Sequence, residues 1–276
     1  MSLDQLPPLK ESLSAQGIVA NKAFGQNFLL DLNVTRKIAR LASPLEGRLV
    51  FEVGPGPGGL TRALLEAGGE VIAIEKDRRF KPILDELAAA APGRLTVVEA
   101  DAMRADFPAL AAEHAAGRPV QVVANLPYNV GTPLLIGWLS GSLRFEKLTL
   151  MFQKEVAERI AAAADEEAYG RLSVLAQATS RPRIAMTLPA RAFTPAPKVD
   201  SAVVQFEPLE QALAPERLAR LERVTQAAFG QRRKMLRSSL KGLGGETLCL
   251  SAGIDPGARA ETIPVEGFLR LADALT

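Results

Sequence analysis

The sequence predicts an α/β protein with a mostly parallel β-sheet, followed by a small all-helical C-terminal domain. Short β-branched runs alternate with longer segments of helical spacing between residues 49 and 152. This alternation is typical of parallel strands whose connecting helices cover both faces of the sheet. After Pro208 the strand pattern disappears and only helical spacing remains, which predicts the second domain.

The main domain is expected to occupy residues 1–208. Its strands are expected at residues 49–53, 70–74, 95–99, 120–124 and 147–152. The helices between them are expected at residues 60–67, 80–91, 107–114 and 133–139. Two further helices at 153–164 and 169–178, and a closing pair of strands at 183–188 and 202–207, complete this domain.

The C-terminal domain is expected to occupy residues 209–276. Helical spacing occurs at residues 215–229, 234–241, 246–252 and 265–275, with Gly-rich breaks at 242–245 and 253–257. A chain of 276 residues suits one large domain with a small appendage.

Composition excludes several classes of protein. Because the chain has one cysteine, Cys249, and one histidine, His114, it can form neither an internal disulfide nor a zinc site built on these residue types. No apolar run approaches membrane-spanning length, and the N-terminus has no apolar signal core. We therefore expect a cytoplasmic protein with no membrane partner, and a monomer. Since the net charge is only +2, a nucleic-acid partner would need a local basic patch.

A glycine-rich loop follows the first expected strand. Gly54, Gly56 and Gly59 lie between this strand and the next helix. Glycines allow a tight turn and a close approach of a ligand to the main chain, and the start of the helix offers unpaired N–H groups. Structural turns also use glycine, but the placement favours a nucleotide-type ligand. Glu52, just before the loop, suits a ligand with a positive centre and an amino-acid end better than a pyrophosphate.

Two acidic residues follow the same pattern on the next strands. Glu75 lies at the end of the second strand, the usual place for an acceptor of ribose hydroxyl groups. Asp101 follows the third strand, where its carboxylate could accept a hydrogen bond from an adenine amine. Each alone could be an ordinary charged strand end. Together with the glycine loop they indicate a crevice for a nucleoside ligand.

The fourth strand is followed by Asn125, Leu126, Pro127 and Tyr128. An adenine amine is a poor nucleophile because its lone pair is delocalised into the ring. An Asn oxygen and a backbone carbonyl that accept its two N–H bonds would localise this lone pair. Pro127 fixes the turn, and Tyr128 offers a face for a flipped base. The alternative is an ordinary turn with a surface tyrosine. The pattern favours methyl transfer to adenine, achieved mostly by positioning.

With these motifs, the chain resembles the ribosomal RNA adenine N6-dimethyltransferases. The resemblance is to the KsgA/RsmA type, which dimethylates two adjacent adenosines near the 3′ end of 16S rRNA in the small (30S) subunit. It runs from about residue 21 to the C-terminus. Besides the glycine loop, Glu75 and Asp101, the matching segments are residues 22–29, 125–129, 153–156, 193–201 and 229–237.

The resemblance implies a Rossmann-like class I methyltransferase domain with a small helical C-terminal domain. The family's cofactor is S-adenosylmethionine, and its binding positions are matched by Asn27, Leu29, Gly54, Glu75, Asp101 and Asn125. The positions at the target base are matched by Asn125, Leu126, Pro127, Tyr128 and Phe193.

Particular roles follow for these residues. By the resemblance, Asn27 and Leu29 are expected to close over the cofactor. Gly54 would then lie at its methionine part, Glu75 at its ribose and Asp101 at its adenine. Asn125 is expected to contact both the cofactor and the target amine, with Leu126 supplying a backbone carbonyl. Tyr128 and Phe193 are expected to hold the base by stacking. This chain departs from the family at Gly131, where many relatives have Ser before Thr.

A basic cluster in the C-terminal domain is the candidate RNA contact. Arg232, Arg233, Lys234 and Arg237 are the predicted RNA-binding residues, with Lys241 nearby. A charge run is more often a solvated helix face. Here acidic residues are scarce between residues 226 and 241, and the family implies contact with RNA. Such contacts to phosphates give affinity and salt sensitivity rather than sequence choice.

Other functions stay open at this level. A relative that methylates a large-subunit rRNA adenine shares the motifs around Asn125 and Phe193, although residues 229–240 and 254–261 favour the small-subunit enzyme. A DNA adenine methyltransferase is a third hypothesis, although no segment resembles a domain that recognises a DNA sequence. The chain could also act as an assembly factor that checks the small subunit, alongside catalysis in ribosome biogenesis.

Overall fold

The computed structural model describes residues 2–21, 25–127, 130–231 and 233–275. The chain forms two compact units, Met1–Lys154 with Ile184–Glu207, and Glu155–Arg183 with Pro208–Thr276. The expected C-terminal domain, residues 209–276, therefore falls in the second unit. That unit also contains a segment, Glu155–Arg183, that the sequence analysis places in the main domain.

The described residues form a seven-stranded sheet in the order β4-β3-β2-β5-β6-β9-β7. Its strands are β2 (Leu49–Val53), β3 (Glu70–Glu75), β4 (Leu95–Glu99), β5 (Val120–Asn125), β6 (Lys147–Gln153), β7 (Ser180–Leu188) and β9 (Ser201–Pro208). The strands from β4 to β6 are parallel, and β9 runs antiparallel to β6. Every residue of β2 is buried, so this strand is covered on both faces of the sheet.

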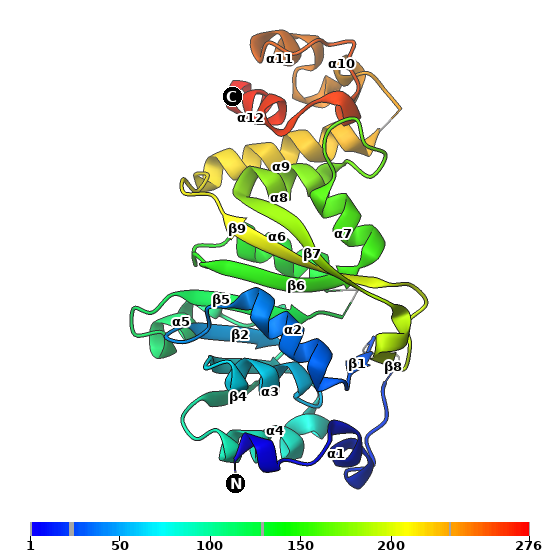
Figure 1. The fold of residues 1–276 in the computed structure, drawn as a ribbon. Coiled ribbons are helices and arrows are strands. Elements are labelled where there is room, and N and C mark those ends of the chain that lie inside the picture. Colours follow the sequence, from blue (N-terminus) through cyan, green and yellow to red (C-terminus); the bar gives the residue numbers. More distant parts are fainter. Residues whose placement is uncertain (1, 22–24, 128–129, 232, 276) are drawn as a thin grey trace. The chain divides into compact units, whose positions relative to one another are not determined.

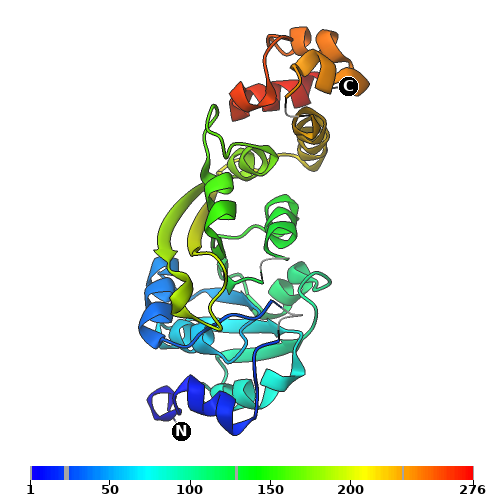
Figure 2. The ribbon, with the colours of Figure 1, turned by 90° about the vertical axis from the view of Figure 1, so that its right-hand side faces the viewer.

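Helices cover both faces of this sheet (Figures 1 and 2). On one face lie α2 (Leu32–Ala42) and α3 (Gly59–Glu66), and on the other α5 (Phe107–His114) and α6 (Gly131–Ser140). Helix α4 (Lys81–Ala90) connects β3 to β4. Helix α2 was not predicted from the sequence, although Asp31 caps it by accepting a hydrogen bond from the backbone N–H of Asn33 at 2.8 Å.

The N-terminal part of the chain also has structure that the sequence analysis did not predict. It contains a short 3₁₀ helix, η1 (Leu3–Gln5), and α1 (Leu9–Ala15). A two-residue strand, β1 (Phe28–Leu29), then pairs antiparallel with β8 (Phe193–Thr194), which follows a 3₁₀ turn, η4 (Ala190–Ala192). Leu29 lies opposite Phe193 in this small sheet. The pairing brings the N-terminal segment next to a motif from far along the sequence.

The second unit is mostly helical and also contains the first residues of β7. Its helices are α7 (Lys154–Ala161), whose first residue belongs to the first unit, α8 (Arg171–Thr179), α9 (Pro215–Gly230), α10 (Leu236–Ser239), α11 (Gly245–Ser251) and α12 (Val265–Ala274), with 3₁₀ turns η5 (Lys241–Leu243) and η6 (Ala260–Thr262). The expected helix at 234–241 is shorter than predicted, because Met235 is extended and bridges to Arg259.

Contacts around one aromatic residue explain why Glu155–Arg183 belongs to the helical unit. Tyr169 is buried, and its hydroxyl donates to the carbonyl of Ile263 at 2.9 Å. Its ring lies 6.0 Å from that of Phe229 on α9, which lies 5.4 Å from Phe268 on α12.

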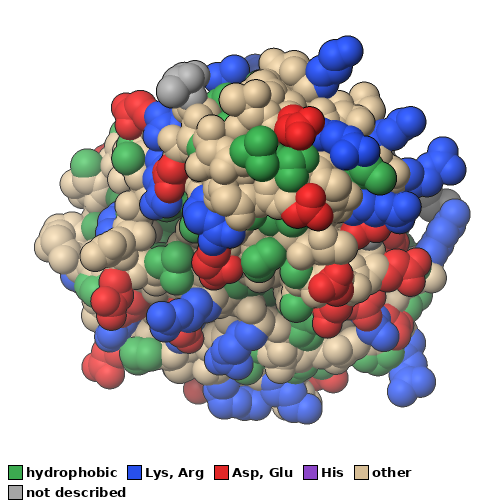
Figure 3. All heavy atoms as spheres, turned by 90° about the horizontal axis from the view of Figure 1, so that it is seen from above, with side chains coloured by type: hydrophobic (Ala, Val, Ile, Leu, Met, Phe, Trp, Pro, Cys, Tyr) green, Lys and Arg blue, Asp and Glu red, His purple; other side chains and the backbone are tan. Residues whose placement is uncertain are grey.

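In Figure 3, Lys and Arg side chains are interspersed with Asp and Glu on the visible face. Within the described residues, no helix is long and apolar enough to cross a membrane.

Candidate active site

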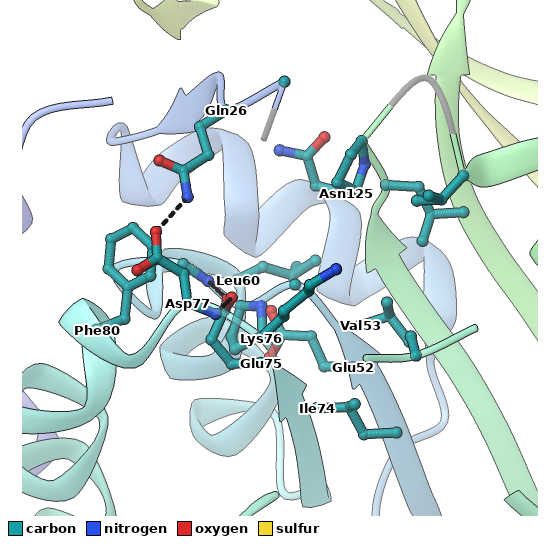
Figure 4. A pocket seen from close by; sticks show the side chains of 18 of the residues that line it. Gln26, Glu52, Val53, Leu60, Ile74, Glu75, Lys76, Asp77, Phe80 and Asn125 are labelled. Carbon is teal, nitrogen blue, oxygen red and sulfur yellow. Dashed lines mark hydrogen bonds between the residues drawn. The ribbon is translucent and has the colours of Figure 1, made fainter. Parts of the chain in front are cut away.

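A cavity of about 350 Å³ lies at the carboxyl ends of the parallel strands. Strand β2 pairs with β3 on one side and β5 on the other, which is the point of an open α/β sheet where ligands bind. Figure 4 shows Gln26 and Asn125 on one side of the cavity and Glu52 and Glu75 on the other. The predicted site residues that line it are Asn27, Leu29, Gly54, Glu75, Asp101, Asn125, Leu126 and Pro127.

The glycine loop forms one wall of the cavity. Gly54, Gly56 and Gly58 have φ angles of +68°, +55° and +81°, values that residues with a Cβ atom rarely adopt. The N–H of Gly54 donates to the carbonyl of Ile74 at 2.9 Å. At Gly59, a Cβ would lie 2.7 Å from the carbonyl oxygen of Leu29. The loop therefore needs glycine both for its turns and for the close approach of the N-terminal segment.

Glu75 joins the glycine loop to the end of β3. Its carboxylate accepts hydrogen bonds from the backbone N–H groups of Gly56 at 3.0 Å and Asp77 at 2.8 Å. Burial raises the pKa of Glu75, and these hydrogen bonds act in the opposite direction. The carboxylate is thus held in place at the cavity wall, where it can accept hydrogen bonds from a ligand's hydroxyl groups.

Glu52 is the most deeply buried acidic side chain of the cavity wall. It is 1% exposed, and burial raises its pKa to about 8. Its Oε2 atom has no hydrogen-bond partner within the described part of the chain. Because an unpartnered buried carboxyl oxygen is costly, a ligand with a positive group would stabilise it.

Asp101 lies beyond the end of β4 and lines the cavity. Its Oδ2 atom accepts a hydrogen bond from Nζ of Lys76 at 2.9 Å, and its Oδ1 atom accepts one from the N–H of Met103 at 3.1 Å. The bond from the Lys76 ammonium holds the pKa of Asp101 below its usual range. The carboxylate is therefore ionised and can accept a further hydrogen bond from an amine.

Asn125 is the last residue of β5. Its Nδ2 atom donates to the backbone carbonyl of Asn27 at 3.3 Å, so the strand end is tied to the N-terminal segment. Because the amide nitrogen is engaged in this way, Oδ1 is the atom that can accept a bond from an incoming amine. Pro127 lies close to the glycine loop, since a Cβ on Gly54 would be 3.9 Å from its Cδ atom.

The structure does not bring every predicted residue to the cavity. Phe193 is 4% exposed and pairs with Leu29, but its side chain is not among those that line the cavity. Tyr128 and Arg232 lie outside the described residues. Arg233, Lys234 and Arg237 are exposed on the second unit.

The cavity also contains residues that the sequence analysis missed. They include Gln26, Phe28, Lys76, Asp77 and Phe80. Lys76 and Asp77 directly follow Glu75, so their position after a strand was a usable signal. Gln26 and Phe28 belong to the segment 22–29 that resembles the family, so their neighbours Asn27 and Leu29 were a usable signal for them as well.

The fold and the site together define a Rossmann-like methyltransferase: a parallel sheet, a glycine loop after β2, and acidic residues at the end of β3 and just after β4 around one cavity. The profile of the ribosomal RNA adenine dimethylase family matches residues 18–276, and the chain belongs to that family. The predicted fold class, family and enzyme class, an rRNA adenine dimethyltransferase, are confirmed by these findings.

Relatives and solved structures agree with this assignment. The chain is 65% identical over 274 residues to the ribosomal RNA small subunit methyltransferase A of Phenylobacterium zucineum (strain HLK1), covering 99% of this chain and 94% of that protein. A dimethyladenosine transferase from Plasmodium falciparum has the same fold, with a TM-score of 0.71, 24% identity and coverage of 86% and 93%. The 23S rRNA methyltransferase ErmE has a TM-score of 0.68, 27% identity and coverage of 90% and 99%.

Proposed function

We propose that this enzyme uses S-adenosylmethionine to dimethylate N6 of two adjacent adenosines near the 3′ end of 16S rRNA, in the small (30S) subunit. The observation that carries the substrate is the 65% identity with a small-subunit methyltransferase over nearly the whole chain, against 27% with a large-subunit enzyme. The enzyme would act as a monomer in the cytoplasm, where it contributes to ribosome biogenesis.

The chemistry of the cavity fits S-adenosylmethionine. The unpartnered oxygen of Glu52 in the cavity wall supports a ligand that carries positively charged groups, as S-adenosylmethionine does in its ammonium and its sulfonium. Glu75 would accept bonds from the ribose hydroxyls and Asp101 from the adenine amine, with Gly54 against the methionine part. Asn27 and Leu29 would close this site from the N-terminal side. When bound, the cofactor supplies a methyl group on a positively charged sulfur.

The residues at the end of β5 would prepare the target amine. Oδ1 of Asn125 and the backbone carbonyl of Leu126 would accept its two N–H bonds and so localise the nitrogen lone pair. Pro127 keeps this turn rigid. Tyr128 and Phe193 would stack on the flipped base, which requires the buried ring of Phe193 to turn toward the cavity. The proton can leave to water after transfer, so no general base is needed.

The test is to incubate the enzyme and labelled cofactor with small subunits from cells that lack it, and separately with large-subunit RNA and with duplex DNA. Mass analysis of the RNA then locates the modified adenines. We expect two adjacent dimethylated adenosines near the 3′ end of 16S rRNA and no label elsewhere. Label on large-subunit RNA or on DNA would refute the proposed substrate.

The basic cluster yields a separate prediction about RNA binding. We expect the triple variant Arg232→Glu, Arg233→Glu and Lys234→Glu to weaken small-subunit binding. The salt slope, which is the slope of the logarithm of the binding constant against the logarithm of the salt concentration, should fall in magnitude by about 2 to 3, since each lost phosphate contact removes about 0.7–0.9. Affinity for S-adenosylhomocysteine should not change. The control is charge reversal of Lys37 and Arg40, which are exposed on α2. An unchanged affinity and salt slope in the triple variant would contradict the RNA role.

A further inference from the structure

Gln26 connects the N-terminal segment to the end of β3. Its Nε2 atom donates to Oδ2 of Asp77 at 2.8 Å, and its Oε1 atom accepts from Nη2 of Arg79 at 3.3 Å. The same Oε1 atom accepts from the backbone N–H of Asn21 at 2.9 Å. One amide side chain therefore uses both its donor and its acceptor to hold two parts of the chain together; Figure 4 shows the bond to Asp77.

Asp77 and Arg79 complete this network. Nη2 of Arg79 lies 2.6 Å from Oδ2 of Asp77, and its Nη1 atom donates to the carbonyl of Val19 at 3.1 Å. Asp77 is only 7% exposed, so its hydrogen bonds are shielded from water. The segment from Val19 to Gln26 is thus fastened at both of these positions to the same short stretch of chain.

Apolar contacts support the network from the side of the N-terminal helix. Leu13 and Ile18 form one buried cluster with Phe28 and Phe80. The rings of Phe28 and Phe80 meet edge to face at 5.6 Å, and both residues line the cavity. The side chains that cover the cavity wall are therefore packed against residues outside it.

The network reaches the proposed cofactor site directly. The backbone N–H of Asp77 donates to Oε1 of Glu75 at 2.8 Å, and Glu75 is the proposed ribose partner. On the other side, Gln26 directly precedes Asn27, whose carbonyl accepts the bond from Asn125. Gln26 is thus the link between the ribose side of the cavity and the segment that crosses it.

We propose that Gln26 is a positioning residue: through Asp77 and Arg79 it fastens residues 25–29 over the cavity, and this sets the affinity for the cofactor. It does so without contact with the reacting atoms, so the rate of methyl transfer at saturating cofactor does not depend on it. This inference rests on the proposed function, because it concerns the same site.

The test is Gln26→Glu, which keeps the size and shape of the side chain. The new carboxylate can still accept from Arg79 and Asn21, but it faces Asp77 without a hydrogen to donate. We expect affinity for S-adenosylhomocysteine, measured by calorimetry, to fall about tenfold, a change of about 1.4 kcal/mol. The single-turnover rate at saturating cofactor should stay within about twofold of the wild type.

A second substitution separates positioning from a general loss of structure. In the double variant Gln26→Glu with Asp77→Asn, the amide and the carboxylate exchange places, so one hydrogen bond between them can form again. We expect most of the lost affinity to return. The control is Arg78→Ala, which removes an exposed ion pair with Glu99 next to the network and should leave affinity unchanged.

Each outcome decides between the two proposals. If the wild type binds S-adenosylhomocysteine and methylates small subunits, but Gln26→Glu binds it equally well, the role of Gln26 is refuted and the proposed function stands. Loss of transfer rate at saturating cofactor, or no rescue in the double variant, also refutes it. If the wild type itself neither binds the cofactor product nor methylates RNA, the proposed function fails.

Discussion

Replacing Asn125 with alanine should lower the rate of methyl transfer by roughly 10²–10³-fold, by analogy with the loss of one positioned polar group in other active sites. Nδ2 of Asn125 donates to the carbonyl of Asn27, and in the proposed mechanism Oδ1 accepts an N–H bond of the target amine. Alanine removes that acceptor, so the adenine lone pair stays delocalised. Single-turnover transfer to small subunits, at saturating cofactor, measures the effect.

Binding measurements separate this effect from a damaged site. Asn125→Ala should bind small subunits like the wild type, and its affinity for S-adenosylhomocysteine should fall less than tenfold. Asn33→Ala, at an exposed position on α2, is the matched control and should transfer methyl groups normally. A variant at Asn125 that retains the wild-type rate would refute the proposed mechanism.

The same variant addresses the alternative that the chain serves subunit assembly as a binding protein. Cells that carry only Asn125→Ala should contain unmethylated small subunits. If their growth and subunit profiles match those of cells without the protein, methylation accounts for the whole phenotype. If they match the wild type instead, the binding role is the one that matters for growth.

The sheet was predictable because its strands carry their own signal. The strands β2, β3, β5 and β6 are mostly buried apolar runs, and the observed ends of all five strands from β2 to β6 differ from the predicted ones by at most one residue. Buried parallel strands are apolar along their length and are bounded by turn residues, so local composition suffices. The small sheet of β1 and β8 was not predictable in this way. Strand β1 has only two residues, Phe28 and Leu29, which is too short for a hydrophobic periodicity. These residues are extended because they pair with β8.

The site residues likewise divide into those that local sequence patterns predict and those that depend on contacts far along the chain. Gly54, Glu75, Asp101 and Asn125 were found because each stands at the end of a strand, and strand ends meet at one edge of the sheet. Gln26 lies in the segment 22–29 that resembles the family, but its hydrogen-bond network was not predicted, since its partners Asp77 and Arg79 are about fifty residues away. The sequence also showed that Glu52 precedes the loop, but its burial follows from the packing of the whole domain.

Replacing Glu52 with glutamine should stabilise the protein without cofactor, and increasingly so as the pH rises. The pKa of Glu52 is raised from 4.5 to about 8 by burial. Between these values the folded protein holds a proton that the unfolded chain has released, so stability falls as the pH increases. The slope approaches about 1.4 kcal/mol per pH unit for one group. Glutamine has the same shape and no charge, so it escapes this loss.

Thermal unfolding at pH 5, 7 and 8.5 checks this prediction. The difference in Tm between Glu52→Gln and the wild type should be smallest at pH 5 and largest at pH 8.5. Other groups that titrate over this range affect both proteins alike and cancel in the difference. Glu86→Gln, at an exposed position on α4, should show no such trend. A Tm difference that does not depend on pH would contradict the buried, protonated state of Glu52.

Cofactor binding should change in the opposite direction. A positively charged ligand favours the ionised carboxylate, so below about pH 8 the wild type must release a proton from Glu52 when S-adenosylmethionine binds. Its affinity should therefore increase from pH 6 to pH 8, and titration calorimetry in buffers of different ionisation enthalpy should detect the proton. Glu52→Gln should bind more weakly and release less. A carboxyl group that destabilises the ligand-free protein but strengthens binding of a positively charged ligand is expected at a binding site, where residues are retained for function at a cost in stability.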